Sequence, residues 1–258
     1  SNDGYLLQYV KDKNIPCYGI EPTHGTAQAA REKGIEVVED FFGVDVASRL
    51  AKKHRHADLM VANNVLAHVP NINSFVKGVK KMLHKDGCWI VEVPHLLNLI
   101  NKTQFDTIYH EHFSYLSILA IDYLLKEFDL RIFDINKIPT HGGSLRIFVC
   151  HQESFYKENK SVPKIRDEEF EFGLNNEDIY LNFQHKVDIK KHKIIKYLEN
   201  LNDEQIYGFG APAKATTLIN YCKIDKFISC IIDNNLTKQN KYIPGTKIQI
   251  KNIDHLIL

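Results

Sequence analysis

The feature that most constrains this chain is a regular alternation of short apolar runs and helix-like segments over its first hundred residues. Four such runs are separated by segments long enough for a helix: 17–20, 35–38, 58–62 and 88–93. Between the last two runs, the apolar residues of 73–84 recur at the spacing of one helix face, and Gly87 follows where a helix is expected to stop. This alternation predicts strand–helix–strand units and a parallel β-sheet.

The pattern changes after a helix-like stretch at 118–128. Two strand-like runs, 130–135 and 144–150, are joined by the connection Pro139-Thr-His-Gly-Gly143. A connection this short suits only an antiparallel pair. A parallel sheet that ends in an antiparallel hairpin is the arrangement of class I (Rossmann-like) methyltransferases, a likeness of fold that carries little weight for function by itself.

The second half of the chain predicts a further, smaller α/β unit. Residues 152–182 are charged and weakly periodic, which predicts a bridge with helix content, and a long helix is expected at 187–201. A second strand–helix–strand unit follows, with its elements at 205–209, 213–221 and 227–233. The expected parts are an α/β domain at 1–152, a helical bridge at 153–200 and a second α/β domain at 201–258.

Composition excludes several classes of protein. The 258 residues carry 33 Lys and Arg against 32 Asp and Glu, and a net charge of +1 gives no general attraction to nucleic acid or to anionic lipid. No run approaches the roughly 18 apolar residues of a membrane span, and no signal-like segment begins the chain, so a cytoplasmic protein is expected. The 5 cysteines are scattered without a CxxC pair, which suggests neither a disulfide framework nor a zinc site.

A turn at the start of the chain and an acidic residue after it fit a nucleotide. The turn Ser1-Asn-Asp-Gly4 precedes a helix-like segment, and Glu21 closes the apolar run 17–20 at the spacing expected of a carboxylate that binds ribose hydroxyls. In the alternative interpretation, Asp3 is a helix N-cap and Glu21 a solvated loop residue. Such a turn should follow a first strand, so either the sequence is a fragment or the site lacks this wall.

The densest group of reactive side chains is the segment Thr107-Ile-Tyr-His-Glu-His-Phe-Ser-Tyr115. Because histidine titrates near neutrality and a neighbouring carboxylate can orient it, this segment predicts acid–base chemistry. A His-x-His metal site and a structural cluster of paired polar groups are the alternatives. Upstream, Asn63, Asn64 and His68 follow the third apolar run, at the end of a strand where open α/β sheets bind ligands, although His68 could instead lie on a helix face.

A second glycine turn, Tyr207-Gly-Phe-Gly-Ala-Pro-Ala-Lys214, leads from a predicted strand into a predicted helix. The backbone amides at a helix N-terminus, together with a lysine, suit a phosphate group. The turn is neither a full GxGxxG motif nor a Walker loop, and a purely structural turn is the alternative.

Five segments in this order resemble the nucleotide-sugar C-methyltransferases, which add a methyl branch to deoxysugars of antibiotics and surface polysaccharides. The segments are 1–7, 63–70, 105–112, 141–146 and 207–214. The resemblance covers nearly the whole chain. It departs from the family at His95, where a tyrosine is usual, and at Ala215, where a glycine is usual, and both departures bear on substrate fit.

The resemblance implies a first domain that binds S-adenosylmethionine and a second that binds a nucleotide sugar. The cofactor residues it implies are Asn2, Asp3, Gly4, Glu21 and Asn63. The residues it implies at the reacting centre are Tyr109, Glu111, His112 and His68, and those at the nucleotide sugar are Gly208, Gly210 and Lys214. Similar proteins also carry an N-terminal zinc domain with paired CxxC motifs and a C-terminal extension, and neither is in this sequence, so zinc is expected only in that absent domain.

The expected reaction is S-adenosylmethionine-dependent C-methylation next to the ketone of an NDP-4-keto-deoxysugar. His112 is the expected base, Glu111 its orienting neighbour, and Tyr109 or His68 the donor to the enolate. A sugar hydroxyl as methyl acceptor stays open. So do two functions of other classes: a non-catalytic protein that binds a nucleotide sugar, and an NAD-dependent oxidoreductase that would use the turn at 207–214. The sugar, the nucleotide and the oligomeric state stay open as well.

Overall fold

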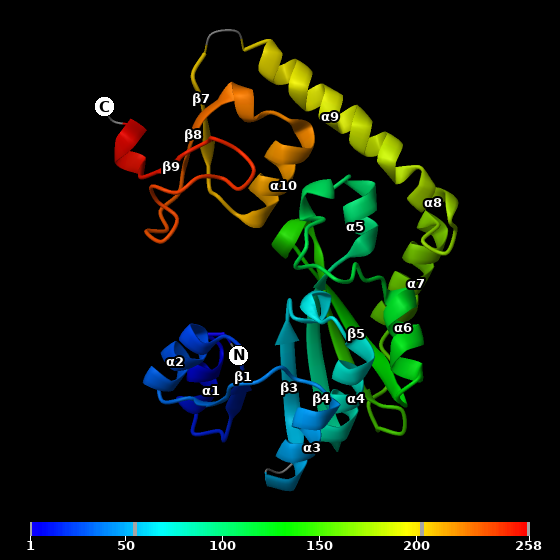
Figure 1. Cartoon of the computed structure of the whole chain (residues 1–258). Helices are drawn as coiled ribbons and strands as arrows, with labels where there is room; N and C mark the ends of the chain where they lie inside the picture. Colours follow the sequence, from blue (N-terminus) through cyan, green and yellow to red (C-terminus); the bar gives the residue numbers. More distant parts are fainter. Residues whose placement is uncertain (1, 54–55, 202–203, 257–258) are drawn as a thin grey trace.

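The computed structural model describes residues 2–53, 56–201 and 204–256, and these residues form two α/β parts joined by a long helix (Figure 1). The strands are β1 (Tyr18–Ile20), β2 (Glu36–Val38), β3 (Ala57–Asn63), β4 (Leu83–Pro94), β5 (Leu130–Ile138), β6 (Ser144–His151), β7 (Ile206–Phe209), β8 (Ile228–Ile232) and β9 (Ile250–Lys251). The helices are α1 (Leu7–Lys11), α2 (His24–Glu32), α3 (Val44–Lys53), α4 (Ile72–Met82), α5 (Leu96–Asn101), α6 (Ile118–Lys126), α7 (Ser161–Phe172), α8 (Asp178–Leu181), α9 (Phe183–Glu199) and α10 (Ala213–Cys222). Short 3-10 turns are η1 (Leu66–His68), η2 (Phe105–Thr107), η3 (Thr140–Gly142), η4 (Asp225–Phe227) and η5 (Ile253–Leu256).

The first part, which carries β1 to β6, contains two sheets. β1 and β2 form a parallel pair that lies apart from the larger sheet in Figure 1. The larger sheet has the strand order β3-β4-β6-β5, in which β3 and β4 are parallel and β6 runs antiparallel to both of its neighbours. The predicted parallel sheet that ends in an antiparallel hairpin is therefore confirmed for β3, β4 and the β5–β6 hairpin, whereas the first two predicted strands pair with each other in a sheet of their own. β3 forms one end of this sheet, and its residues Leu59 and Val61 are exposed.

The boundary between α4 and β4 differs from the prediction. The helix expected at 73–84 ends at Met82, because Leu83 already has extended backbone angles (φ −71°, ψ 130°) and pairs with Ala57 of β3. Gly87 consequently lies inside β4, where an added Cβ would stand 2.9 Å from the carbonyl oxygen of Ala57. The interpretation of Gly87 as a helix stop was wrong, since this glycine permits the close approach of two strands.

One hydrophobic core covers the four-stranded sheet. Trp89 and Val91 of β4 and Ile147 of β6 are almost fully buried in it, together with residues of α4 and α6. Val162 and Ile165 of α7 belong to the same core. The first helix after residue 152 therefore packs on the sheet of the first part.

The second part is a three-stranded parallel sheet in the order β7-β8-β9. The sequence pattern predicted β7, α10 and β8 but not β9, which has only two residues. The α9 helix, expected at 187–201, begins four residues earlier and runs along the outer side of the molecule (Figure 1). The predicted second α/β unit is thus confirmed as a fold.

The two parts meet through η2. Phe105 is buried in the hydrophobic cluster of the second part, with Ile219 and Cys222 of α10, and its ring lies 5.3 Å from that of Tyr221. Lys190 of α9 adds hydrogen bonds from Nζ to the carbonyl oxygens of Lys102 (2.9 Å) and Thr103 (3.1 Å). The segment that carries the predicted reactive side chains therefore docks directly on α10. Within the described residues, no helix is both long enough and apolar enough to cross a bilayer.

Candidate functional site

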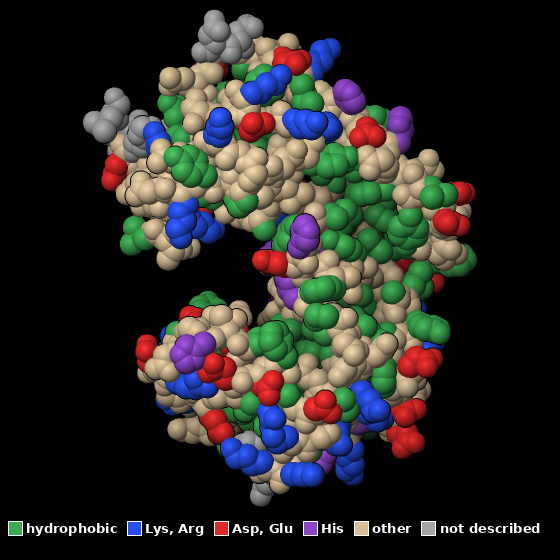
Figure 2. All heavy atoms as spheres, in the orientation of Figure 1, with side chains coloured by type: hydrophobic (Ala, Val, Ile, Leu, Met, Phe, Trp, Pro, Cys, Tyr) green, Lys and Arg blue, Asp and Glu red, His purple; other side chains and the backbone are tan. Residues whose placement is uncertain are grey.

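A cavity of about 110 Å³ lies between the two parts, where the carboxyl ends of β3 and β4 meet η1 and η2. Its polar lining residues are Asn64, His68, Thr107, Tyr109, His112, Ser114, Tyr115, His141 and Lys214. Pockets that enclose a whole ligand usually measure about 300–1,000 Å³, so this cavity has the size for one part of a larger ligand. Figure 2 shows histidine side chains gathered at the inner side of the hollow between the two parts.

His112 is the best-placed base in this cavity. Its Nδ1 lies 2.8 Å from the carbonyl oxygen of Thr107, which can only accept a hydrogen bond. In the neutral ring, Nδ1 therefore carries the hydrogen and Nε2 keeps its lone pair. Burial holds the pKa of His112 below its ordinary value of 6.5, against the opposing effect of the Thr107 hydrogen bond. The neutral, basic form of this side chain is thus favoured.

Two rings pack against His112. Its centroid lies 4.2 Å from that of Tyr109 and 4.8 Å from that of His68. Burial raises the pKa of Tyr109, and the charges of Glu111 and Asp106 raise it further, so this phenol stays protonated near neutrality and can donate a hydrogen bond. The structure thus brings together three of the four residues predicted at the reacting centre.

The fourth residue, Glu111, does not orient His112 as predicted. Its side chain is exposed and is not among the cavity-lining residues, whereas its carbonyl oxygen accepts a hydrogen bond from Nδ1 of His68 at 2.8 Å. The carbonyl of Thr107 holds His112 instead. The sequence suggested a carboxylate because one stood next to the histidine, but the chain turns after Tyr109 so that backbone carbonyls face both rings.

Lys214 reaches this cavity from the second part of the molecule. It lies in the first turn of α10, is half-buried, and lines the cavity with Tyr109 and His112. Gly208 and Gly210, predicted to bind the same ligand, are not among the lining residues. An added Cβ on Gly208 would stand 2.8 Å from Cγ1 of Ile231, and Gly210 has φ +85°, so both glycines have structural reasons to be present.

The glycine turn before α10 is occupied by a side chain of the next strand. Oδ2 of Asp233 accepts a hydrogen bond from the amide of Ala211 at 2.7 Å, and Nζ of Lys238 donates to the carbonyl oxygen of Ala211 at 2.9 Å. Because a carboxylate lies on this turn, its field opposes a phosphate there. The side chain of Lys214 in the cavity is the better-placed cation for an anionic ligand.

Three of the five residues predicted at the cofactor, Asn2, Gly4 and Glu21, lie together at the end of β1. Glu21 is 8% exposed, and its carboxylate accepts hydrogen bonds from the amides of Asn2 (2.9 Å) and Thr23 (3.1 Å). Gly4 has φ +78° and lies buried in the same turn. Asp3 points away toward Lys33, at 2.8 Å, and this ion pair lowers the pKa of the exposed Asp3 carboxyl. A carboxylate acceptor beside a glycine turn fits the hydroxyl groups of a ribose.

Asn64, rather than Asn63, lines the cavity. Asn63 is exposed at the end of β3, whereas Asn64 has φ +53° and turns its side chain inward. Oδ1 of Asn64 is buried without a hydrogen-bond partner among the described residues. An orphaned acceptor in a native fold calls for a partner from outside, and a bound ligand with a hydroxyl or amino group would supply one.

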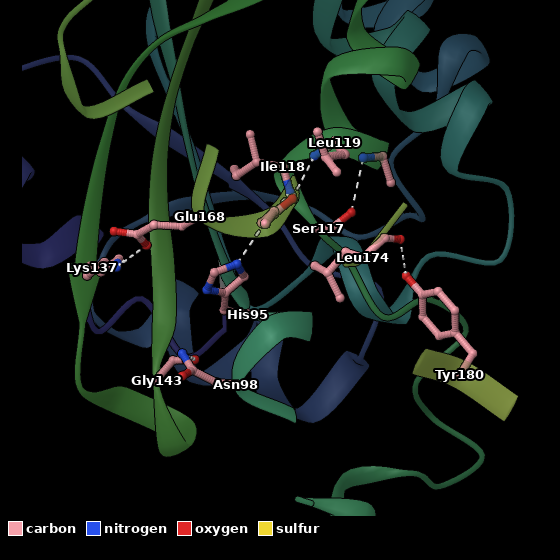
Figure 3. A network of polar contacts seen from close by, with 12 residues as sticks. His95, Asn98, Ser117, Ile118, Leu119, Lys137, Gly143, Glu168, Leu174 and Tyr180 are labelled. Carbon is pink, nitrogen blue, oxygen red and sulfur yellow. Dashed lines mark hydrogen bonds and ion pairs between the residues drawn. The ribbon is translucent and has the colours of Figure 1, made fainter. Parts of the chain in front are cut away.

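A buried polar network supports one wall of the cavity (Figure 3). His95 is 3% exposed, and its Nε2 lies 2.8 Å from Oε1 of Glu169, a fully buried residue of α7. The same carboxylate accepts hydrogen bonds from the amides of Ile118 (2.7 Å) and Leu119 (3.0 Å) at the start of α6. His95 thus fixes the backbone before Leu96, a cavity-lining residue, whose amide donates to the carbonyl of Leu116.

Four polar residues of the cavity were not predicted as site residues: Thr107, Ser114, Tyr115 and His141. Thr107 acts through its backbone carbonyl, which no residue pattern reveals. For His141, the available signal was a histidine followed by two glycines in the predicted hairpin connection. Within 2–53, 56–201 and 204–256, no group of three His, Cys, Asp or Glu side chains is arranged to hold a metal ion.

Comparison with known proteins assigns the chain to a family. Residues 1–135 match the family model of a methyltransferase domain, and residues 139–257 match that of the C-methyltransferase C-terminal domain. The C-methyltransferase NovU of Streptomyces niveus is 30% identical over 253 residues, which are 97% of this chain and 60% of that protein. The chain thus spans 60% of the length of this curated relative.

Solved structures resemble the chain more distantly. The PH0226 protein of Pyrococcus horikoshii has a TM-score of 0.47 and 14% identity, and covers 58% of this chain and 78% of its own. A SAM-dependent methyltransferase of Thermotoga maritima, described as a possible histamine N-methyltransferase, has a TM-score of 0.45 and 15% identity, and covers 59% and 78%. The two family models together span nearly all of the sequence, and the chain belongs to the methyltransferase family and carries the C-terminal domain of the C-methyltransferases.

Proposed function

We propose that this protein is a SAM-dependent C-methyltransferase that methylates the carbon next to the ketone of an NDP-4-keto-deoxysugar. The observation that carries the proposal is the arrangement of His112: one ring nitrogen is hydrogen-bonded to a backbone carbonyl, the other is available, and the phenol ring of Tyr109 packs beside it at a tilt. A carbon acid needs a base and a donor to the developing enolate, and this cavity supplies both. Methylation of a hydroxyl group requires no such enolate.

In this proposal, Nε2 of His112 removes the proton from the carbon next to the ketone. The electron pair of the C–H bond moves into the enolate, and the proton stays on the imidazole, which then has a hydrogen on both nitrogens. The Thr107 carbonyl accepts from Nδ1 throughout and keeps the ring oriented. A base placed in this way contributes a factor of about 10²–10⁴ to the rate.

Tyr109 is the proposed donor to the enolate oxygen. Its raised pKa keeps the hydroxyl hydrogen in place at neutral pH. His68 suits this role less well, because its Nδ1 faces the carbonyl of Glu111 and therefore holds the single hydrogen of the neutral ring. We assign His68 to packing against His112, which fixes the plane of the base.

The cofactor would be held by Glu21 with the turn at Asn2 and Gly4. The carboxylate accepts hydrogen bonds from ribose hydroxyls, and Gly4 has no side chain to obstruct the backbone. When bound, S-adenosylmethionine supplies an electrophilic methyl group. Asn64, with its orphaned Oδ1, would offer an acceptor to the ligand from the end of β3.

The test is incubation of the protein with S-adenosylmethionine and dTDP-, GDP- or CDP-linked 4-keto-6-deoxysugars in D₂O. Mass spectrometry should detect one added methyl group, and NMR should locate it on the carbon next to the ketone, with deuterium exchange at that carbon. A methyl group found on oxygen would overturn C-methylation. Nucleotide-sugar binding without turnover would favour a non-catalytic binding protein, and hydride transfer to NAD would favour an oxidoreductase.

A further inference from the structure

The β5–β6 hairpin presents His141 to the cavity from its tip. His141 lines the cavity together with His112 and Lys214, yet it lies on a different element from each of them. Three consecutive residues of the tip have positive φ angles: His141 (54°), Gly142 (85°) and Gly143 (118°). This backbone path aims the tip at the cavity and requires glycine at the second and third positions.

Four donors from the segment 95–104 hold this tip in place. The carbonyl oxygen of Gly142 accepts from Nζ of Lys102 (2.9 Å) and from Nε2 of Gln104 (3.1 Å). The carbonyl oxygen of Gly143 accepts from Nδ2 of Asn98 (3.4 Å) and from the amide of His95 (3.1 Å). Figure 3 shows Asn98 and Gly143 beside each other below His95. A side chain on either glycine would collide with the Gln104 or Asn98 side chain that holds it.

These four hydrogen bonds, which we call the clamp, explain the backbone conformation of the tip. They do not explain why residue 141 is a histidine. A left-handed backbone is most easily taken by glycine, whereas asparagine, aspartate and histidine, the next most frequent residues there, each carry a conformational cost relative to glycine. The side chain of His141 is exposed, and no hydrogen bond from it to another described residue accounts for its presence. Strained residues that the surrounding structure holds in place are concentrated at functional sites.

We propose that His141 contacts the substrate and hydrogen-bonds a hydroxyl group of the sugar. This inference rests on the proposed function, since it takes the ligand of the cavity to be a nucleotide sugar. A neutral imidazole offers one donor and one acceptor, and a hydroxyl group can match either. Because β5–β6 belongs to the first part while Lys214 belongs to the second, the sugar is held from both sides of the cavity.

The test compares the dissociation constants of the same dTDP-, GDP- or CDP-linked 4-keto-6-deoxysugars for wild type and His141→Gly by titration calorimetry. Glycine removes the side chain and accepts the left-handed backbone, so the variant should keep the thermal midpoint of the wild type. We expect binding to weaken about tenfold, the value of one well-made hydrogen bond to a partly buried group. His141→Asn, which also accepts this backbone, should retain part of the affinity. The affinity for S-adenosylmethionine should not change.

Two further variants test whether His141 acts by contacting the sugar or only by shaping the hairpin tip. His110→Ala alters an exposed histidine of the reactive segment that does not line the cavity, and it should bind like wild type. Gln104→Ala removes one donor of the clamp, and by itself it should weaken sugar binding. Combined with His141→Gly, it should cause no further loss of affinity. Additive losses would mean that the clamp acts independently of His141.

Measurements of binding and of turnover distinguish the role of His141 from the proposed C-methylation. Unchanged affinity in His141→Gly, or a wild type that binds none of the nucleotide sugars, would overturn the role of His141. A wild type that binds the sugar and loses affinity in the variant supports that role even if it transfers no methyl group, in which case the proposed C-methylation alone fails.

Discussion

Two glycine turns of this chain each meet a carboxylate from the end of a parallel strand, and the two carboxylates are used differently. Glu21 accepts hydrogen bonds from the amides of Asn2 and Thr23 at the start of the first part. Asp233 accepts from the amides of Ala211 and Asn235 in the second part, and Lys238 lies 3.7 Å from it. The second carboxylate therefore belongs to a local network with its own cation.

The similar local geometry of the two turns does not imply that they bind the same ligand. The turn of the second part is closed by Asp233 and Lys238, so it serves chiefly to start α10 at the right place. The residue delivered to the cavity is Lys214, in the first turn of α10. The first turn, with a buried carboxylate, suits the hydroxyl groups of a cofactor. We therefore propose a division in which the first turn holds the cofactor and the second only positions Lys214 at the cavity.

The largest expected effect concerns His112, the proposed base in the cavity. His112→Asn should reduce turnover by a factor of about 10²–10⁴, because it removes the base while the two turns stay intact. It should also suppress the exchange of solvent deuterium into the carbon next to the ketone, and leave the affinity for S-adenosylmethionine unchanged. Full exchange in the variant would move the base to Tyr109 or His68.

The next effect compares the two carboxylates directly. Glu21→Gln should weaken S-adenosylmethionine binding by about 1–3 kcal/mol, the cost of leaving polar partners unmatched. Asp233→Asn is the matched control and should leave that affinity unchanged. Titration calorimetry measures both, and equal losses in the two variants would break the distinction between the turns.

Lys214→Met should raise the Michaelis constant for the nucleotide sugar by about two- to fivefold, the range for one partly exposed charge contact. The turnover number should change less, because such a contact is made in both the ground and the transition state. Added salt should imitate the change in wild type. Lys193→Met, an exposed lysine of α9 away from the cavity, is the control.

The pH profile gives a smaller effect. Burial lowers the pKa of His112 from its ordinary 6.5, and the charges of His68 and Lys214 add to the lowering. The base works when neutral, so the acid limb of kcat/KM against pH should have its midpoint below 6.5. Lys214→Met should move that midpoint upward. A midpoint above 6.5 in wild type would mean that another group titrates.

The smallest effect concerns stability. The amides of Asn235 and Ala211 lower the pKa of Asp233 from its ordinary 3.8, so its charged form stabilises the fold above that pH and the contribution is lost as the pH falls through the lower, folded-state pKa. Asp233→Asn should cost about 1 kcal/mol at neutral pH and lower the thermal midpoint by a few degrees. The difference between variant and wild type should vanish in acid.

Hydropathy patterns predicted most of the fold because the strands and helices are buried on regular faces. The parallel pairing of β3 with β4 and the antiparallel β5–β6 hairpin followed from spacing alone, whereas the order of the strands in the sheet was not predicted. The two-residue β9 carries too few side chains for any period to be visible. The end of α4 depended on pairing between Leu83 and Ala57, which are far apart in sequence.

The site was predicted less completely, for a physical reason. His112, Tyr109 and Glu21 belong to residue types whose chemistry suggests a function wherever they lie. The Thr107 carbonyl and the orphaned oxygen of Asn64 depend on backbone direction, which composition does not encode. Glu111 was misjudged because adjacency in sequence was taken for contact in space.

The carboxylate of Glu169 has a consequence for where the protein can be cut. It lies on α7, yet it accepts from two amides at the start of α6 and meets His95 at the cavity wall. A protein shortened after residue 152 would leave these three donors buried without an acceptor and strip Val162 and Ile165 from the core. The smallest piece that keeps the cavity wall therefore extends past the end of α7 at Phe172.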